Sequence, residues 1–257
     1  PNIFLQHIHS RQRESALNLS KVGRWSELDL TIKNDEFYLN GFAQTPDSIN
    51  TFLKVFSKQK PVEMRVQEVL PTQTAALVFL GISNFKAYLN QYRQFLSFNG
   101  RARAHEDELK KLSTALGCNV EEFYTNIFSE EISLAFIPFE GEDYDNSWFV
   151  VSRVKSQGQA KQEFQNLLSN YANKQGVPAS RYEKTFTIDR EKSVSIFKLP
   201  QSGLHQALFG SMFESVNDLY FTFIDSYVVF GSSFNSLSRF VLAKVHILKF
   251  KQTADEK

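Results

Sequence analysis

The chain carries one pattern of strand, turn, strand and helix near each of its two ends, and this repetition constrains the fold more than any other feature. The second strand of each copy ends in a glycine, Gly41 in the first and Gly231 in the second. The apolar residues have the same spacing in both copies, so both copies should bury the same faces of their strands and helix. The pattern therefore predicts an internally duplicated structure. The alternative is that a common motif agrees by chance, and a repeated unit carries no chemistry by itself. The first copy comprises residues 28–32, 37–41 and 48–53, and the second residues 219–223, 227–231 and 236–241.

Apolar periodicity predicts further strands and helices. An unbroken apolar run from Ala75 to Ile82 has the length of a strand that is covered on both faces, so we expect a central strand there. Helices are predicted where apolar residues recur every three or four positions, and hairpins where short alternating runs flank a polar turn. The predicted strands lie at residues 25–32, 37–42, 75–82, 131–139, 147–154, 182–188 and 194–199, and the predicted helices at 3–20, 46–56, 85–97, 119–128 and 158–174, with a charged helix that ends at Gly117.

The predicted elements favour an α+β fold in which mainly antiparallel strands form sheets and helices pack on one face. The duplication divides the chain at residue 69. Residues 1–69 would be the closing part of a first repeat unit, and residues 70–257 a fuller second unit. A chain of 257 residues can bury a core without disulfides or metals, and we predict no cofactor.

Charge and cysteine content exclude several classes of protein. The 29 basic and 28 acidic residues nearly cancel, so no strong field attracts nucleic acid, and no nucleic-acid partner is expected. The single cysteine, Cys118, rules out an internal disulfide. We interpret Cys118 as a small buried hydrophobic residue, with a reactive thiolate as the alternative. The chain begins at Pro1 without an initiator methionine, so we expect a piece of a longer protein.

Short motifs in the first third of the chain indicate a family. They are Gly-Arg-Trp-Ser-Glu-Leu-Asp-Leu at residues 23–30, Lys-Asn-Asp at 33–35, Leu-Asn-Gly-Phe at 39–42, and Leu-Pro-Thr-Gln-Thr-Ala-Ala at 70–76. Together they resemble a bacterial family of envelope-associated proteins that is known only as a domain of unknown function. The resemblance implies an extracytoplasmic or periplasmic module of a larger protein, tethered to the membrane by an N-terminal segment absent here. It implies no catalytic residues.

One acidic loop is a candidate metal site. Residues 140–146 offer several carboxylates, and hard cations such as Ca²⁺ prefer oxygen ligands. Their spacing does not match that of a calcium-binding loop with ligands at alternating positions. Glu140, Asp143 and Asp145 are therefore weak candidates, and a solvated hairpin loop without metal is the alternative.

Catalytic signatures are absent from the sequence. There is no Gly-x-Ser-x-Gly elbow, no phosphate-binding glycine loop and no His-Glu-x-x-His motif. We therefore assign no catalytic residue and leave open whether the chain is an enzyme. The histidines are scattered at His7, His9, His105, His205 and His246.

Phenylalanine is the outlier of the composition, with 25 residues in the chain. Rings are dense between residues 209 and 240, where a single core layer can be overfilled. Rings left outside such a layer would form a surface for a partner. We name Phe209, Phe213 and Phe234 as a possible interaction surface, with burial in the core as the alternative.

These features favour a non-catalytic binding or scaffolding module of a larger bacterial cell-envelope protein, with a protein or another envelope component as its partner. One alternative is a hydrolase-type enzyme with dispersed catalytic residues, which requires a pocket containing a carboxylate and a histidine. The other is a carrier of a lipid or another apolar ligand, which requires an elongated cavity of roughly several hundred Å³ lined by phenylalanine.

Overall fold

The structure is a computed structural model that describes residues 25–33, 36–44, 51–190 and 192–255. The predicted helix at residues 3–20 lies outside the described residues, as does the start of the one predicted at 46–56. The chain divides into two compact units, which are residues 1–59 with 86–103 and residues 60–85 with 104–257. The division into repeat units at residue 69 stays a prediction.

The first unit contains a two-stranded antiparallel sheet. Strand β1 (Trp25–Lys33) pairs with β2 (Glu36–Gln44) along its whole length, which confirms the predicted hairpin. A short 3-10 helix (Phe52–Phe56) stands where the end of an α-helix was expected. Helix α3 (Phe85–Phe98) follows the prediction closely, because its apolar residues recur at three- and four-residue steps and form one buried stripe.

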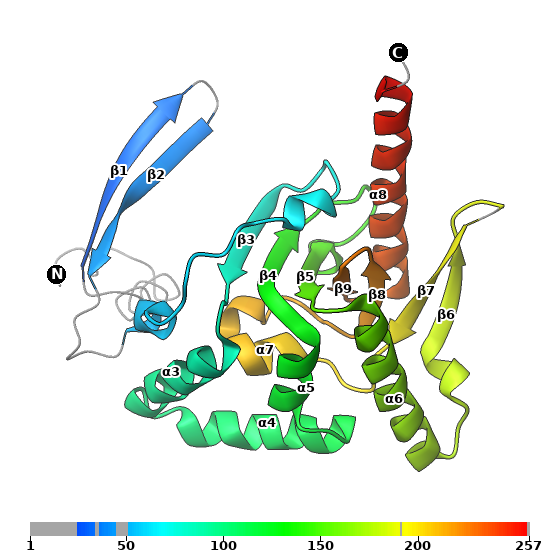
Figure 1. Cartoon of the computed structure of the whole chain (residues 1–257), viewed down its shortest axis with the longest axis horizontal. Coiled ribbons are helices and arrows are strands. Elements are labelled where there is room, and N and C mark those ends of the chain that lie inside the picture. The colour runs from blue at the N-terminus through cyan, green and yellow to red at the C-terminus, as the bar shows by residue number, and fades with distance from the viewer. Residues whose placement is uncertain (1–24, 34–35, 45–50, 191, 256–257) are drawn as a thin grey trace. The chain divides into compact units, whose positions relative to one another are not determined.

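The second unit is built on a seven-stranded antiparallel sheet with the order β3-β4-β5-β9-β8-β7-β6. Figure 1 shows the β6–β7 hairpin at the edge of this sheet opposite β3. The α+β class and the antiparallel pairing are therefore confirmed. The strands are β3 (Ala76–Gly81), β4 (Phe128–Phe136), β5 (Trp148–Val154), β6 (Glu183–Thr187), β7 (Ser193–Lys198), β8 (Tyr220–Ile224) and β9 (Tyr227–Gly231).

The apolar run at residues 75–82 is not a central strand, which corrects the prediction. It forms β3 at one edge of the sheet, and the Val78 side chain is 39% exposed. Leu77 and Phe79 pack against the core, whereas Val78 lies on the opposite face because side chains alternate along a strand. An apolar sequence alone therefore did not distinguish an edge strand from a buried one.

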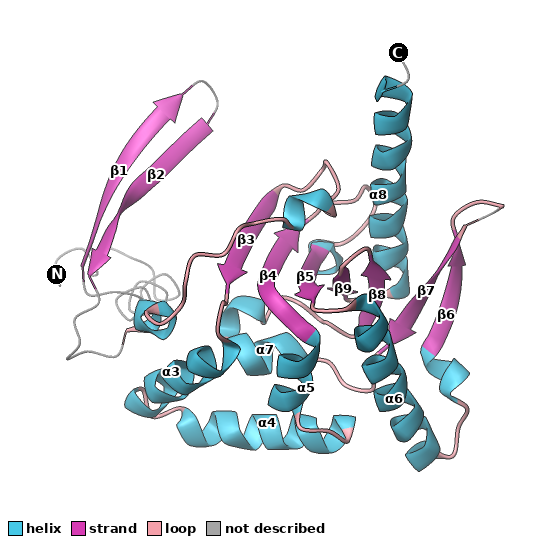
Figure 2. Cartoon of the chain, in the orientation of Figure 1, coloured by secondary structure: helices cyan, strands magenta, loops and turns pink. Residues whose placement is uncertain are grey.

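Helices lie on both faces of the sheet rather than on one, which is a second correction (Figure 2). On β9, Phe230 contacts Phe164 of α6, with the ring centroids 6.2 Å apart. The neighbouring Val229 belongs instead to the core cluster that includes Phe240 of α8. Because Val229 and Phe230 point to opposite faces, α6 and α8 cover opposite faces. The helices are α4 (Ala102–Leu116), α5 (Val120–Ile127), α6 (Gln157–Gln175), α7 (Leu204–Phe209) and α8 (Phe234–Asp255).

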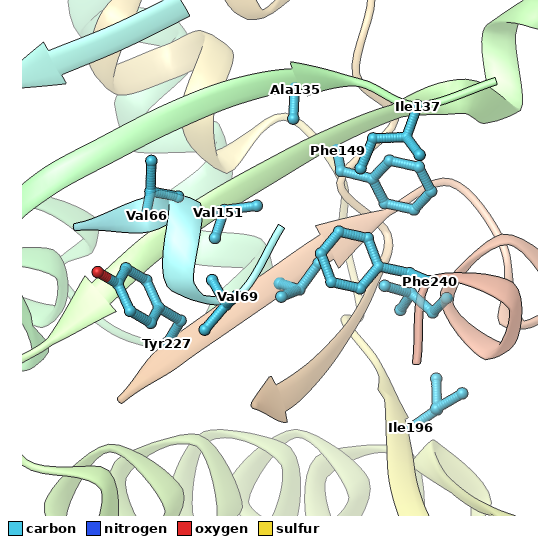
Figure 3. Packing of buried hydrophobic residues seen from close by; sticks show 11 residues of the cluster. Val66, Val69, Ala135, Ile137, Phe149, Val151, Ile196, Tyr227 and Phe240 are labelled. Atoms are coloured by element: carbon cyan, nitrogen blue, oxygen red, sulfur yellow. The ribbon is translucent and has the colours of Figure 1, made fainter. Parts of the chain in front are cut away.

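The core on the α8 face is an aliphatic and aromatic cluster, drawn in Figure 3. Phe149 of β5 meets Phe240 of α8 with the ring centroids 5.2 Å apart. Gly231 lies beside this contact, and a Cβ atom there would stand only 3.2 Å from the Phe149 ring and 3.3 Å from Leu237. Strand β9 ends at Gly231 as predicted, and close packing explains why a glycine stands there.

The hairpins of the two copies are similar but not identical. In both copies two residues separate the paired strands. However, Gly41 pairs with Leu28, whereas Gly231 pairs with Tyr220 rather than with Leu219, the residue aligned with Leu28. The environments also differ, because Leu30 of the first hairpin is 57% exposed while Phe221 of the second is buried. The strand pairing thus does not reproduce the residue-by-residue equivalence on which the predicted duplication rests.

Candidate functional site

A cleft of about 310 Å³ lies between α6 and strands β6, β7 and β8. Three phenylalanine rings line it, namely Phe164 from α6, Phe197 from β7 and Phe223 from β8. The Phe164 and Phe223 rings meet edge to face with their centroids 5.9 Å apart. The cleft therefore has an aromatic floor on the α6 face of the sheet.

Local sequence places Phe164 over the sheet. Helix α6 begins at an N-cap serine, Ser156, whose hydroxyl accepts the backbone N–H of Gln159 at 3.4 Å. It ends at Gly176, whose φ of 66° lies in the left-handed region that glycine adopts readily. Between these ends, Ala160, Phe164, Leu167, Leu168 and Ala172 are buried. The helix thus presents one apolar stripe, and Phe164 stands at its centre.

The cleft opens where two strands of the sheet separate. Strands β7 and β8 pair only from Lys198–Tyr220 to Ile196–Thr222, although both strands continue further. Past this point β7 remains paired with β6, and β8 remains paired with β9. The Thr222 hydroxyl donates a 2.9 Å hydrogen bond to the backbone carbonyl of Ser195 at the end of the ladder.

The rim of the cleft is polar and electrically mixed. Lys161 of α6 and Glu183 of β6 contribute opposite charges, and Gln165 of α6 contributes an amide. The Lys161 Nζ atom lies 5.7 Å from the centroid of the Phe223 ring, within the range of a cation–π contact. An aromatic floor with a few polar groups around it is typical of sites for partly apolar ligands.

A histidine–aspartate pair is buried elsewhere in the same unit. The Nδ1 atom of His205 lies 2.7 Å from Oδ2 of Asp218, and both side chains are almost fully buried. Asp218 also accepts the backbone N–H of His205 at 2.9 Å and that of Gly203 at 2.5 Å. Asp218 therefore fixes both the histidine ring and the start of α7.

The far side of the His205 ring faces other rings. Its centroid lies 4.5 Å from that of Phe230 in an edge-to-face contact, and the Tyr124 ring is 6.0 Å away. Within the described part of the chain, the buried Nε2 atom of His205 has no hydrogen-bond partner. Neither His205 nor Asp218 lines the aromatic cleft. The pair resembles catalytic dyads in composition, but its position is that of a structural group.

A second buried polar cluster lies on the α8 face. Glu131 of β4 is buried and accepts hydrogen bonds from Arg153 at 3.1 Å and from the backbone N–H of Arg65 at 2.9 Å. The Tyr227 hydroxyl also donates to Glu131, at 3.2 Å. Burial, followed by the negative charge of Glu131, raises the pKa of Tyr227 well above its ordinary value. This cluster connects β4, β5 and β9, and the Glu131 carboxylate is occupied by these hydrogen bonds.

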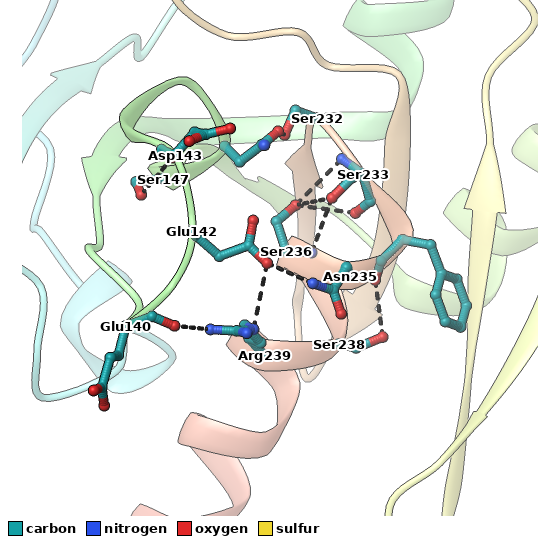
Figure 4. Close-up of polar contacts among 12 residues, drawn as sticks. Glu140, Glu142, Asp143, Ser147, Ser232, Ser233, Asn235, Ser236, Ser238 and Arg239 are labelled. Atoms are coloured by element: carbon teal, nitrogen blue, oxygen red, sulfur yellow. Dashed lines mark hydrogen bonds and ion pairs between the residues drawn. The ribbon is translucent and has the colours of Figure 1, made fainter.

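The acidic loop packs against the start of α8 (Figure 4). The Glu142 carboxylate accepts a 2.5 Å hydrogen bond from Asn235 and pairs with Arg239 at 3.4 Å. The candidate ligands Glu140, Asp143 and Asp145 have exposed side chains. Among the described residues, no group of three or more His, Cys, Asp or Glu side chains is placed to hold a metal ion.

The proposed phenylalanine surface is corrected at two of its three positions. Phe209 is 2% exposed and Phe213 is 1% exposed, and their rings contact each other and the ring of His205. Phe234 is half-buried at the start of α8 and meets the Phe186 ring edge to face. Phe209 and Phe213 therefore belong to the core, whereas Phe223, a third ring of the dense region, lines the cleft.

Among the other histidines, the structure describes the side chain of His105. His105 of α4 is buried, and its Nε2 atom lies 2.7 Å from the backbone carbonyl of Ala207 in α7. His7 and His9 lie outside the described residues, and the His246 side chain is not described. This contact is therefore a structural link between α4 and α7.

Cys118 is half-buried between α4 and α5, and we expect its thiol to react slowly. Burial, followed by the nearby charge of Glu163, raises the pKa of the Cys118 thiol. At pH 8 the folded protein should therefore be alkylated by iodoacetamide several-fold more slowly than the unfolded chain, whose thiol pKa is about 8.5. Glu163→Gln should speed the reaction. Equal rates in folded and unfolded protein would contradict the expectation.

Comparisons with protein-family models, with curated proteins and with solved structures found no match to this chain. Among the described residues, no helix is both long enough and apolar enough to cross a membrane.

Proposed function

We propose that this chain is a non-catalytic binding module and that the aromatic cleft is its ligand site. The observation that supports the proposal is the cleft, with its three rings and mixed polar rim. Its volume of about 310 Å³ lies at the lower end of the about 300–1,000 Å³ that ligand sites occupy. A place in a larger bacterial cell-envelope protein, as the sequence resemblance implies, is part of the same proposal.

The two alternative functions have less support. A hydrolase would need its histidine and carboxylate at a cavity, whereas His205 and Asp218 lie behind rings and do not line the cleft. A lipid carrier would need an apolar lining throughout, whereas Lys161, Gln165 and Glu183 stand at the rim. The cleft favours a small ligand that combines a flat apolar group with polar groups.

Indole is a suitable probe of the cleft because it has a flat ring and one hydrogen-bond donor. We expect it to bind with a Kd of about 1 mM, which is reasonable for a fragment of this size. The measurement is a titration followed by backbone amide chemical shifts. The shifts should concentrate on α6, β7 and β8.

The matched variants are Phe223→Ala and Phe186→Ala. Both rings are half-buried and lie on sheet strands, but only Phe223 lines the cleft. Losing one ring contact should weaken indole binding about 3- to 10-fold in Phe223→Ala and leave it unchanged in Phe186→Ala. Circular dichroism checks that both variants fold. Indole binding that is absent, or that is equally weak in the two variants, would refute the proposed site.

A further inference from the structure

Two opposite charges stand at the rim of the aromatic cleft, and the protein neutralises neither of them. Lys161 of α6 and Glu183 of β6 both line the cleft and are exposed. Within the part of the chain that the structure describes, neither side chain forms an ion pair or a hydrogen bond. Both charges are therefore available to a ligand.

Local sequence explains why Lys161 has no acidic partner on its own helix. Opposite charges on a helix pair when they lie three or four positions apart. None of the residues at those distances from Lys161 is acidic, since they are Gln157, Gly158, Phe164 and Gln165. The lysine therefore keeps its charge for groups outside α6.

Glu183 likewise has no cation opposite it on the sheet. It pairs with Phe197 across the β6–β7 ladder, and its diagonal neighbour on that strand is Ser195. Lys184, the next residue of β6, points to the other face of the sheet, where its Nζ atom lies 5.7 Å from the centroid of the Phe234 ring. The sheet therefore separates the Glu183 carboxylate from the cation beside it in the sequence.

The two charges lie on opposite sides of the aromatic floor. The Lys161 Nζ atom is 5.7 Å from the centroid of the Phe223 ring on β8, whereas Glu183 stands opposite Phe197 on β7. The centroids of these two rings are 6.2 Å apart. Because β7 lies between β6 and β8, the cation stands at the β8 side of the floor and the anion at the β6 side.

From this arrangement, and resting on the proposed function, we infer that the ligand is a small aromatic zwitterion, with an ammonium group at one end of its ring and a carboxylate at the other. The ring would pack against the aromatic floor, while the carboxylate would face Lys161 and the ammonium group would face Glu183. A ligand with a single charge would complement only one side of the rim. The cleft of about 310 Å³ has room for one substituted ring but not for a folded partner.

Four para-substituted rings of similar shape test the two charges separately. The zwitterion is para-(aminomethyl)benzoate, and para-(hydroxymethyl)benzamide is its neutral analogue. The anion para-(hydroxymethyl)benzoate and the cation para-(aminomethyl)benzamide each keep one charge. At neutral pH each charge should tighten binding to the whole chain about 3-fold, within the range for exposed ion pairs, so the zwitterion should bind about 10-fold more tightly than the neutral compound. Binding is measured by titration of backbone amide chemical shifts.

Single substitutions assign each preference to one side chain. Lys161→Gln should abolish the preference for the carboxylate and keep that for the ammonium group, and Glu183→Gln should do the reverse. Lys184→Gln is the matched control, because it removes the same charge as Lys161→Gln but from the opposite face of the sheet, and it should change neither preference. Raising sodium chloride from about 0.02 M to about 0.5 M should remove most of both preferences, since salt screens exposed charges.

The outcomes separate this inference from the proposed function. If indole binds at the cleft but the zwitterion binds no more tightly than its neutral or singly charged analogues, or Lys161→Gln behaves like Lys184→Gln, the zwitterion inference is refuted and the binding site stands. If neither indole nor any of the four compounds perturbs the cleft, both proposals fail. Tightest binding of the zwitterion, with one preference lost in each cleft variant, supports both.

Discussion

Replacing Asp218 by alanine is expected to lower the free energy of unfolding by about 3–5 kcal/mol, the cost of removing one partner from a buried, hydrogen-bonded pair. The change removes the acceptor for the His205 ring and for the backbone N–H groups of Gly203 and His205. The two His205 donors would then be buried without a partner, which costs more than the loss of the hydrogen bonds themselves. The measurement is chemical denaturation followed by circular dichroism.

Asp143→Ala is the control for the Asp218 variant, because the Asp143 side chain is exposed in the acidic loop. It should change the stability by no more than about 0.5 kcal/mol. A double-mutant cycle with His205→Ala then isolates the pair, and we expect a coupling energy of about 1–3 kcal/mol. A loss below about 1 kcal/mol in Asp218→Ala would mean that the pair does not hold α7 in place.

Replacing Phe230 by alanine is expected to destabilise the fold by about 3–5 kcal/mol, the range for a large ring removed from a packed core. Phe230 is fully buried on β9, and its ring contacts those of Phe128, Phe221 and His205. The cavity would lie between the ring layer and the histidine–aspartate pair, where the surrounding sheet cannot collapse. Denaturant unfolding measures the effect.

A graded substitution tests whether the loss at Phe230 comes from packing. Phe230→Leu retains most of the apolar volume and should cost about half as much as alanine or less. Phe98→Ala, at an exposed ring, should stay within about 0.5 kcal/mol of the unchanged protein. If Phe230→Ala were as mild as Phe98→Ala, the ring layer would not be the centre of the core.

Local signals in the sequence were sufficient for most of the helices and hairpins. Helix α6 is an example, because a serine cap, an apolar stripe and a terminal glycine are all encoded within residues 156–176. Helix α7 was missed, since six residues are too few for a periodic pattern. Its start is fixed by Asp218, which lies beyond α7 in the sequence and contacts it only after folding.

The sequence predicted the residue type that forms the candidate site, but not which residues form it. The abundance of phenylalanine predicted either an aromatic core or an aromatic surface. The structure contains a layer of buried rings, and Phe223 lines the cleft beside it. The residues first named as a surface, Phe209 and Phe213, are buried, because the pattern does not specify which face a helix covers. No local signal marks Ser195 as the place where β7 leaves β8.

The sequence by itself determined the α+β class and the pairing of neighbouring strands into hairpins, because periodicity, caps and turns act over a few residues. Tertiary structure alone decided that β3 is an edge strand, that α6 and α8 cover opposite faces, and that a cleft opens between β7 and β8. These features depend on contacts between residues far apart in the chain. Their energies are shared across the sheet rather than encoded in any one segment.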